Sequence, residues 1–208
     1  MTMTSAVRSA PPVLLSDRSK RILAIAGSLR RDSLNRRLLQ AAALRAPAGF
    51  VIELYDDLRS IPLFDEDVER ETGGGPESVE HIRRRIASAD GLLIATPEYN
   101  QSIPGVLKNA IDWLSRPPDE VLAGKPVAIV GASGGRWGTR LAQAALRHTL
   151  YATESRVMPA PSLFLGGADA LFDASGTLTD EATGAALERV LAAFAQWVEL
   201  VADLRQAA

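Results

Sequence analysis

The sequence predicts a three-layer α/β sandwich, in which helices cover both faces of a parallel β-sheet. Two observations support this fold class. Short runs of Ile, Leu and Val recur without polar alternation, as expected for strands that are buried on both faces. Segments with apolar residues at helical spacing separate these runs along most of the chain. Such alternation produces parallel strands that are joined by right-handed helical crossovers.

Five strands are expected. Four of them are apolar runs that end in glycine, proline or polar residues, at residues 21–27 (RILAIAG), 51–56 (VIELYD), 91–97 (GLLIATP) and 125–132 (KPVAIVGA). A weaker fifth strand is expected within residues 154–167 (ESRVMPAPSLFLGG). For five parallel strands we expect the order 2-1-3-4-5, which is the flavodoxin-like arrangement.

Five helices are expected between and after the strands, at residues 34–45, 77–89, 104–116, 139–153 and about 180–205. In each, apolar residues recur three or four positions apart, so that one face can pack on the sheet. The sequence contains no internal repeat and no sign of a second domain. We therefore expect one domain over residues 20–208, preceded by a flexible N-terminal extension over residues 1–19.

Composition narrows the classes of function. The 208 residues carry a formal charge of −2, which gives no electrostatic reason to expect nucleic acid or a membrane as partner. Cysteine is absent, so disulfides, thiol nucleophiles and cysteine-ligated metals are excluded, and a cytoplasmic protein is favoured. The two histidines, His81 and His148, lie far apart in helical segments, and we expect no metal site. No apolar run approaches the ~20 residues that a membrane span requires.

The loop after the first strand carries the chemistry of a phosphate site. In parallel sheets of this order, ligands bind at the carboxyl ends of the strands, beside the first strand. Residues 26–35 (AGSLRRDSLN) offer hydroxyls, a guanidinium, an amide and the start of a helix, all of which can hold phosphate. The loop lacks the glycine–lysine pair of a P-loop and the dinucleotide pattern G-x-G-x-x-G. The alternative is an ordinary helix cap, made by Ser33 or Asp32.

The loops after the third and fourth strands are suited to a planar ligand. Residues 96–104 (TPEYNQSIP) contain two prolines and Tyr99, which form a stiff edge with a flat ring; the alternative is a rigid turn with a core tyrosine. Residues 131–138 (GASGGRWG) contain four glycines, which allow close backbone approach; the alternative is a flexible surface loop. Together the three loops predict a phosphorylated planar cofactor. FMN fits better than a dinucleotide, because there is one phosphate loop and no pyrophosphate pattern.

Three segments, GSLRRDSLN, PEYNQSIPGVLKNAIDWLSR and GASGGRWG, resemble in this order the NADPH-dependent FMN reductase family. This flavodoxin-like group includes quinone, chromate and azo-dye reductases. The resemblance covers about residues 20–165, and the family's LPLFDED-like segment is present as residues 61–67 (IPLFDED).

The resemblance implies which residues contact FMN. It assigns the phosphate to Ser28, Arg30, Ser33 and Asn35. It assigns the isoalloxazine ring, largely through backbone groups, to Pro97, Glu98, Tyr99 and Asn100. The far side of the ring is expected to lie against Ser133, Gly134, Gly135 and Arg136.

The resemblance also implies a homodimer or homotetramer, as in other family members. The helix after the third strand is the expected interface, and it carries Lys108, Asp112 and Trp113. The alternative for Trp113 is packing in the core.

The implied activity is an FMN-dependent, ping-pong NAD(P)H oxidoreductase. NADPH or NADH passes a hydride to flavin N5, leaves, and is replaced by a quinone, azo dye, chromate or free flavin. We expect no catalytic side chain, because the flavin carries the hydride. Arg136 is a candidate for the 2′-phosphate of NADPH. Two alternatives stay open: an electron-carrier flavodoxin, for which a strongly acidic docking face is expected and −2 is too little charge, and a non-enzymatic protein for another phosphorylated ligand.

Overall fold

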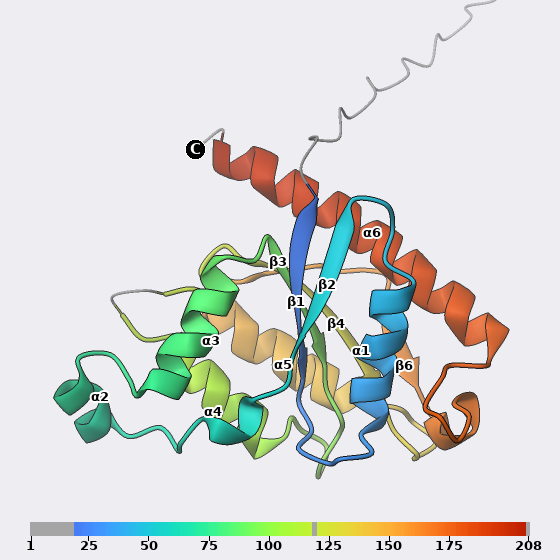
Figure 1. The fold of residues 1–208 in the computed structure, drawn as a ribbon, viewed down its shortest axis with the longest axis horizontal. Coiled ribbons are helices and arrows are strands. Elements are labelled where there is room, and N and C mark those ends of the chain that lie inside the picture. Colours follow the sequence, from blue (N-terminus) through green and yellow to red (C-terminus); the bar gives the residue numbers. More distant parts are fainter. Residues whose placement is uncertain (1–18, 118–119, 207–208) are drawn as a thin grey trace, which may run out of the picture.

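The computed structural model describes residues 19–117 and 120–206. Its parallel sheet has the order β2-β1-β3-β4-β5 (Figure 1), which confirms the predicted topology. The strands span Lys20–Ala26 (β1), Phe50–Tyr55 (β2), Gly91–Ala95 (β3), Pro126–Ala132 (β4), Arg156–Val157 (β5) and Leu163–Leu165 (β6). The expected extension over residues 1–19 lies outside the described residues, apart from Ser19.

The weak fifth strand is two short strands that share one neighbour. β5 pairs with the beginning of β4 and β6 pairs with its end, where Leu163 lies beside Val130. Residues 158–162 separate them and include Pro159 and Pro161, which have no N–H to donate to a sheet. As a result β6 places the residues that follow it at the carboxyl edge of the sheet.

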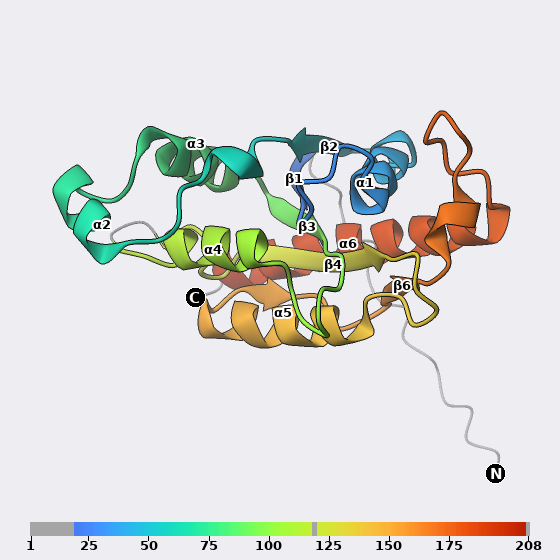
Figure 2. The ribbon, with the colours of Figure 1, turned by 90° about the horizontal axis from the view of Figure 1, so that it is seen from below.

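Each face of the sheet is covered by its own layer of helices. α1 (Leu34–Leu44) and α6 (Glu181–Gln206) pack on one face, while α3 (Glu77–Ala87), α4 (Gly105–Leu114) and α5 (Arg140–Ala152) pack on the other (Figure 2). Within β1, Ile22 and Ala24 contribute to the first core, and Leu23 and Ile25 contribute to the second. This alternation explains why the strand is apolar from Ile22 onward, after the charged Lys20 and Arg21.

Helix α2 and two short 3₁₀ helices were not predicted. α2 (Glu66–Thr72) begins after Asp65, whose side chain caps it, and ends at Gly73 with a left-handed φ of 72°. None of its seven residues is buried, so the apolar spacing that marks the other helices is lacking. The 3₁₀ helices are η1 (Leu58–Ser60) and η2 (Ala168–Leu171). Among the helices of the described residues, none is long and apolar enough to cross a membrane.

A buried lysine stands at the amino end of β4. Lys125 is 7% exposed, and its Nζ donates to the carbonyls of Ile86 and Ala89 at 2.8 Å each. Burial, together with the nearby positive charge of Arg205, lowers the pKa of Lys125 to about 8. A neutral amine still has two N–H groups, which is enough for both carbonyls.

Stability is expected to rise with pH because of Lys125. Between about 8 and 10.5 the unfolded chain holds a proton on this residue that the folded protein has released. The free energy of unfolding therefore rises across this window, by about 3 kcal/mol at most. Urea denaturation at several pH values should show the rise in the wild type and a smaller one in Lys125→Met. Equal slopes in the two proteins would contradict the assignment.

Candidate functional site

Three predicted loops meet in one hollow at the carboxyl edge of the sheet. β1, β3 and β4 are neighbours, and the loops that follow them stay in register through the hydrogen bonds Gly27 N–Ala95 O (2.8 Å) and Thr96 N–Val130 O (3.1 Å). The hollow, called here the three-loop hollow, has a volume of about 90 Å³. It is lined by Ser28, Arg30, Ser33, Leu34, Asn35, Pro97, Glu98, Tyr99, Ala132, Ser133 and Gly134. Of the predicted site residues, only Asn100, Gly135 and Arg136 are missing from this lining.

The first loop presents an electropositive helix start to the hollow. Ser33 caps α1, and its Oγ accepts a hydrogen bond from the Arg36 N–H at 3.3 Å. No acidic residue lies in the first turn of α1. Arg30 is exposed, and nothing in residues 19–117 and 120–206 pairs with its guanidinium. Hydroxyls, a guanidinium and a helix N-terminus together form a donor set that fits a phosphate group.

Asn35 connects the first loop to the third. Its side chain is 2% exposed, its Nδ2 donates to the Ala132 carbonyl at 2.9 Å, and its Oδ1 accepts from the Ala132 N–H at 2.9 Å. Both ends of the amide are therefore engaged by one residue at the end of β4. The sequence indicated the polar chemistry of Asn35 but not this bond to a residue 97 positions away.

The second loop holds Tyr99 in a tight, unusual turn. Tyr99 and Ser102 exchange backbone hydrogen bonds of 3.0 Å each, and Asn100 and Gln101 between them have φ of 49° and 63°. Two successive left-handed residues are typical of a type I′ turn. Tyr99 is 47% exposed beside the hollow, which excludes the alternative of a core tyrosine.

The side chain of Glu98 caps the N-terminus of helix α5. Its Oε2 accepts from the N–H groups of Leu141 at 2.9 Å and Ala142 at 3.0 Å, in the first turn of α5. The side chain of Thr139, the residue before the helix, makes no cap hydrogen bond, and its Oγ1 accepts from Gln143 Nε2 at 3.0 Å. A carboxylate at a helix N-terminus stabilises the helix by about 0.5–2 kcal/mol. No local pattern in the sequence predicts this contact.

The third loop is held by the segment that follows β6. The Ser133 N–H donates to the Leu165 carbonyl at 2.9 Å, and the Ala168 N–H donates to the Ser133 carbonyl at 3.0 Å. Gly167 N–H donates to the Gly135 carbonyl at 3.1 Å. These three hydrogen bonds, called here the clamp, were not predicted from the sequence. The one available signal was the pair Gly166–Gly167 after a weak strand.

Two glycines of the third loop are required by close neighbours. A Cβ on Gly131 would overlap the Thr139 Oγ1, and it would lie 2.6 Å from the Thr96 carbonyl. A Cβ on Gly134 would overlap the Asp169 carboxylate. The glycines therefore serve packing at this edge. The loop is also clamped, which is at odds with the alternative of a flexible surface loop.

A larger, open hollow adjoins the three-loop hollow. It has a volume of about 420 Å³ and is lined by Gly27, Leu29, Arg30, Tyr99, Pro104, Gly105 and Val106. Its size lies in the usual range for small-molecule sites. A Cβ added to Gly105, at the start of α4, would meet no described atom within 4 Å. Tyr99 and Arg30 line both hollows, so a ligand in one can contact a ligand in the other.

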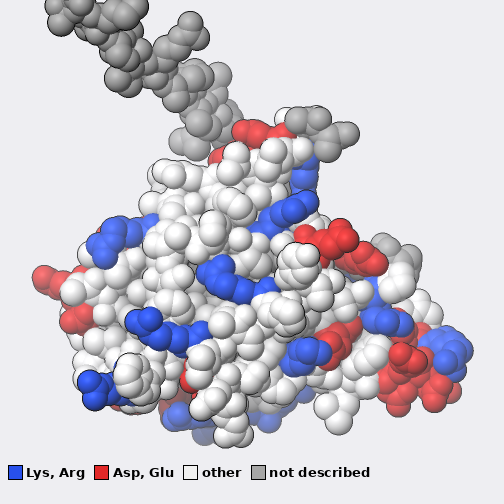
Figure 3. All heavy atoms as spheres, turned by 180° about the vertical axis from the view of Figure 1, so that it is seen from behind, with Lys and Arg blue, Asp and Glu red and all other residues white. Residues whose placement is uncertain are grey.

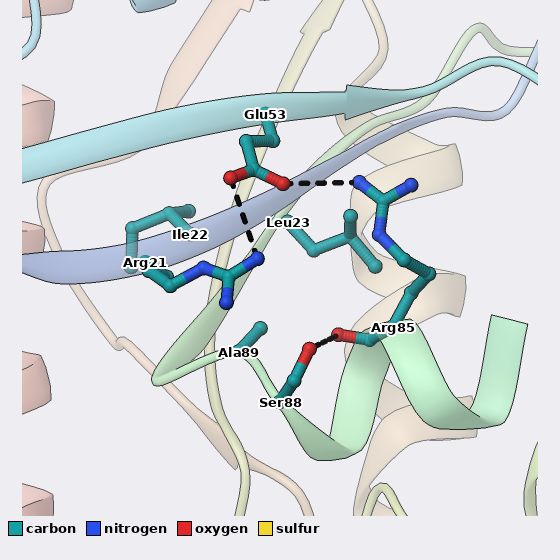
Figure 4. Close-up of a pocket in the computed structure, with 7 residues that line it drawn as sticks. All are labelled: Arg21, Ile22, Leu23, Glu53, Arg85, Ser88 and Ala89. Atoms are coloured by element: carbon teal, nitrogen blue, oxygen red, sulfur yellow. Dashed lines mark hydrogen bonds and ion pairs between the residues drawn. The ribbon is translucent and has the colours of Figure 1, made fainter.

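One further pocket lacks the features of a site. Figure 4 shows a pocket of about 10 Å³ in which Glu53 lies between Arg21 and Arg85, at 3.4 and 3.2 Å. These ion pairs join β1, β2 and α3 near the amino half of the sheet, away from the three loops. In the described part of the chain, no three His, Asp or Glu side chains gather as a metal site would require.

The chain is similar to known reductases over most of its length. A family model described as NADPH-dependent FMN reductase matches residues 20–170. An NAD(P)H-dependent FMN reductase of Pseudomonas aeruginosa is 47% identical over 178 residues, which cover 86% of this chain and 95% of that protein. A quinone reductase of Escherichia coli is 40% identical over 182 residues, covering 86% and 96%. Among solved structures, the flavoenzyme NAD(P)H:(acceptor) oxidoreductase FerB of Paracoccus denitrificans matches with a TM-score of 0.79 and 36% identity, covering 86% and 97%.

Proposed function

The chain belongs to the NADPH-dependent FMN reductase family, and from this premise we propose a ping-pong cycle in which NAD(P)H and a quinone occupy the same hollow in turn. The protein is an oxidoreductase with FMN as cofactor and NAD(P)H as substrate, as the resemblance implied. The alternatives of an electron carrier and of a non-enzymatic protein are set aside by this membership. The observation that supports the proposed site is the convergence of three loops on one hollow.

We propose that the three-loop hollow receives the FMN phosphate. Ser28, Ser33 and the guanidinium of Arg30 are the proposed ligands, together with the N-terminus of α1. Asn35 acts as a brace in this proposal, because its amide already holds Ala132. A phosphate dianion gains from a helix dipole and a charge-assisted hydrogen bond in the same place.

We propose that backbone groups of the second and third loops hold the ring. The proposed contacts on one edge are Pro97, Glu98, Tyr99 and Asn100, and those on the far side are Ser133, Gly134, Gly135 and Arg136. Bound FMN supplies the two-electron chemistry, so the residues of the chain need only position and desolvate the reactants. The left-handed turn at Asn100 and Gln101 and the clamp on Ser133 support rigid edges for that role.

The open hollow is the proposed place for both substrates. Its lining is mostly apolar and it adjoins Tyr99, which offers a flat face to a nicotinamide or a quinone. Because it is open, we also propose azo dyes, chromate and free flavin as acceptors. We further propose that the enzyme works in the cytoplasm, the compartment that the cysteine-free sequence favours.

Kinetics and absorption spectra test the cycle directly. The purified protein, supplied with FMN, should show a flavin spectrum and oxidise NADPH or NADH faster when benzoquinone is added. Double-reciprocal plots at several quinone concentrations should be parallel lines. Intersecting lines would overturn the ping-pong order, and a protein that takes up no FMN would overturn the proposed site.

We also propose a homodimer or homotetramer, with α5 instead of α4 as its interface. On α4 the indole of Trp113 is buried and donates to the Pro62 carbonyl at 2.9 Å, in agreement with core packing. Lys108 of α4 is paired with Asp112 of the same helix at 2.6 Å. The large apolar side chains of α4 are buried or half-buried, and they leave little surface for a second copy.

Helix α5 exposes a stripe suited to a second copy of the chain. Four exposed residues of this helix follow one another at alternating three- and four-residue spacing: Leu141, Ala144, His148 and Tyr151. This is the spacing of a helix–helix seam. In an antiparallel pair, Leu141 of one copy meets Tyr151 of the other, and Arg140 comes near Glu154. On the face of the molecule that carries α5, basic side chains are spread among uncharged surface, and acidic side chains lie mainly toward the rim (Figure 3).

Leu141→Asp is expected to shift the protein toward a smaller assembly, because a charge in the apolar seam opposes close helix contact. Sedimentation velocity at micromolar concentration measures the change. Leu44→Asp, at another exposed leucine on α1, is the matched control and should sediment as the wild type. Equal sedimentation of Leu141→Asp and wild type would place the interface elsewhere.

A further inference from the structure

A third hollow lies on the other side of the first loop and is lined by three arginines. It has a volume of about 80 Å³ and is formed between the loop after β1 and the carboxyl end of β2. Arg30 comes from that loop, Arg36 from α1 and Arg59 from η1. Its remaining lining residues are Ala26, Ser28, Leu29, Tyr55, Asp56 and Leu58. We call it the arginine hollow.

Two of the three guanidiniums are fixed in place by the protein. Arg36 binds Asp56 with both nitrogens, at 2.6 Å and 2.8 Å. Arg59 donates from Nη2 to the Leu29 carbonyl at 2.9 Å. Each of these side chains keeps further N–H groups, because a guanidinium has five. Arginines held in this way lose little conformational freedom when an anion binds.

The charge of the arginine hollow is positive. Three arginines and one aspartate leave a formal charge of +2 on its lining. Tyr55 remains an uncharged phenol, because burial raises its pKa and the neighbouring Asp57 raises it further. Arg30 is already the proposed ligand of the FMN phosphate, so Arg36 and Arg59, from two separate segments, are the cationic groups that this hollow offers to a second phosphate group.

The arginine hollow shares lining residues with both hollows of the proposed active site. Ser28 and Arg30 also line the three-loop hollow, while Leu29 and Arg30 also line the open hollow. A molecule whose one end lies beside Tyr99 can therefore extend past Leu29 to the arginines. NAD(P)H has this form: a nicotinamide at one end, and a pyrophosphate and an adenosine at the other.

We propose that the arginine hollow binds a phosphate group of the adenosine half of NAD(P)H, an inference that rests on the proposed function. The group is either the 2′-phosphate, which NADPH alone carries, or the pyrophosphate, which NADH shares. Arg136, for which the sequence suggested this role, lines none of the three hollows as the described residues outline them. Its guanidinium lies over the ring of Trp137, 5.4 Å from the ring centroid.

Substitution of Arg59 tests the proposal. In the FMN-loaded protein, Arg59→Met should raise the KM for NADPH roughly tenfold and leave kcat nearly unchanged, because one charge-assisted contact is lost. Arg36→Met should have the same direction of effect. Arg31→Met is the matched control, since Arg31 is exposed on the same loop and lines none of these hollows. A rise in the KM for NADPH alone would show that the arginine hollow binds the 2′-phosphate. An equal rise in the KM for NADH would show that it binds the pyrophosphate.

A binding measurement keeps this test separate from turnover. Calorimetry with adenosine 2′,5′-bisphosphate, 5′-AMP and inorganic pyrophosphate reports on the arginine hollow even if no NAD(P)H is oxidised. The wild type should bind at least one of these probes, and Arg59→Met should bind it roughly tenfold more weakly. If KM and probe binding in Arg59→Met and Arg36→Met equal those of the wild type, the proposal is overturned. A wild-type protein that binds a probe but does not oxidise NAD(P)H would instead contradict the proposed function.

Discussion

Asn35→Ala is expected to lower the free energy of unfolding by about 3 kcal/mol, because it leaves two buried backbone groups without partners. The wild-type side chain pairs with both the N–H and the C=O of Ala132, and Asn35 is 2% exposed. The methyl group of alanine can replace neither bond. Urea denaturation followed by circular dichroism measures the change.

Gln40→Ala is the matched control for this prediction. Gln40 is a polar residue on the exposed face of the same helix, so its substitution should change the free energy of unfolding by less than about 0.5 kcal/mol. We also expect Asn35→Ala to weaken FMN binding, since the first and third loops would no longer be tied together. An Asn35→Ala protein as stable as the wild type would show that the brace is unimportant.

Arg30→Ala is expected to weaken FMN binding by roughly ten- to a hundredfold, the range for one charge-assisted hydrogen bond to phosphate. Arg30 is exposed and lines the three-loop hollow, so its loss should leave the free energy of unfolding nearly unchanged. Quenching of flavin fluorescence on titration with protein measures the affinity, and no NAD(P)H is needed.

Riboflavin makes the Arg30 test specific for the phosphate. Riboflavin has the same ring system without the phosphate, so its affinity should be equal in Arg30→Ala and in the wild type. Arg31→Ala, one residue along the loop, should bind both flavins as the wild type does. Unchanged FMN affinity in Arg30→Ala would remove the phosphate assignment, and an equal loss for riboflavin would indicate a distorted ring site.

The elements of the fold could be predicted because their signals are local. From Ile22 onward β1 is apolar, since Ile22 and Leu23 enter cores on opposite faces of the sheet, and this pattern is visible in a few adjacent residues. The loop compositions likewise indicated three loops that the structure brings together around one hollow. The fifth strand was the exception. Its division into β5 and β6 became visible only in the structure, where the two strands pair with opposite ends of β4.

The residues that support the site could not be predicted in the same way. Glu98 caps a helix 43 positions away, and Asn35 holds a strand end 97 positions away. A carboxylate or an amide has the same local signature whether it faces a ligand, a helix end or solvent. The arginine hollow is a further case, because its three guanidiniums belong to separate segments of the chain.

The sequence by itself determined the strand order, the three loops and the family, because periodicity, glycine and proline content and motif order are properties of neighbouring residues. Only the tertiary structure decided what each side chain contacts. It made Asn35 a brace, Glu98 a helix cap and Trp113 a core residue, and it placed three arginines around one hollow. The physical reason is that these roles depend on which distant backbone groups lie within hydrogen-bond distance, and strand pairing sets those distances.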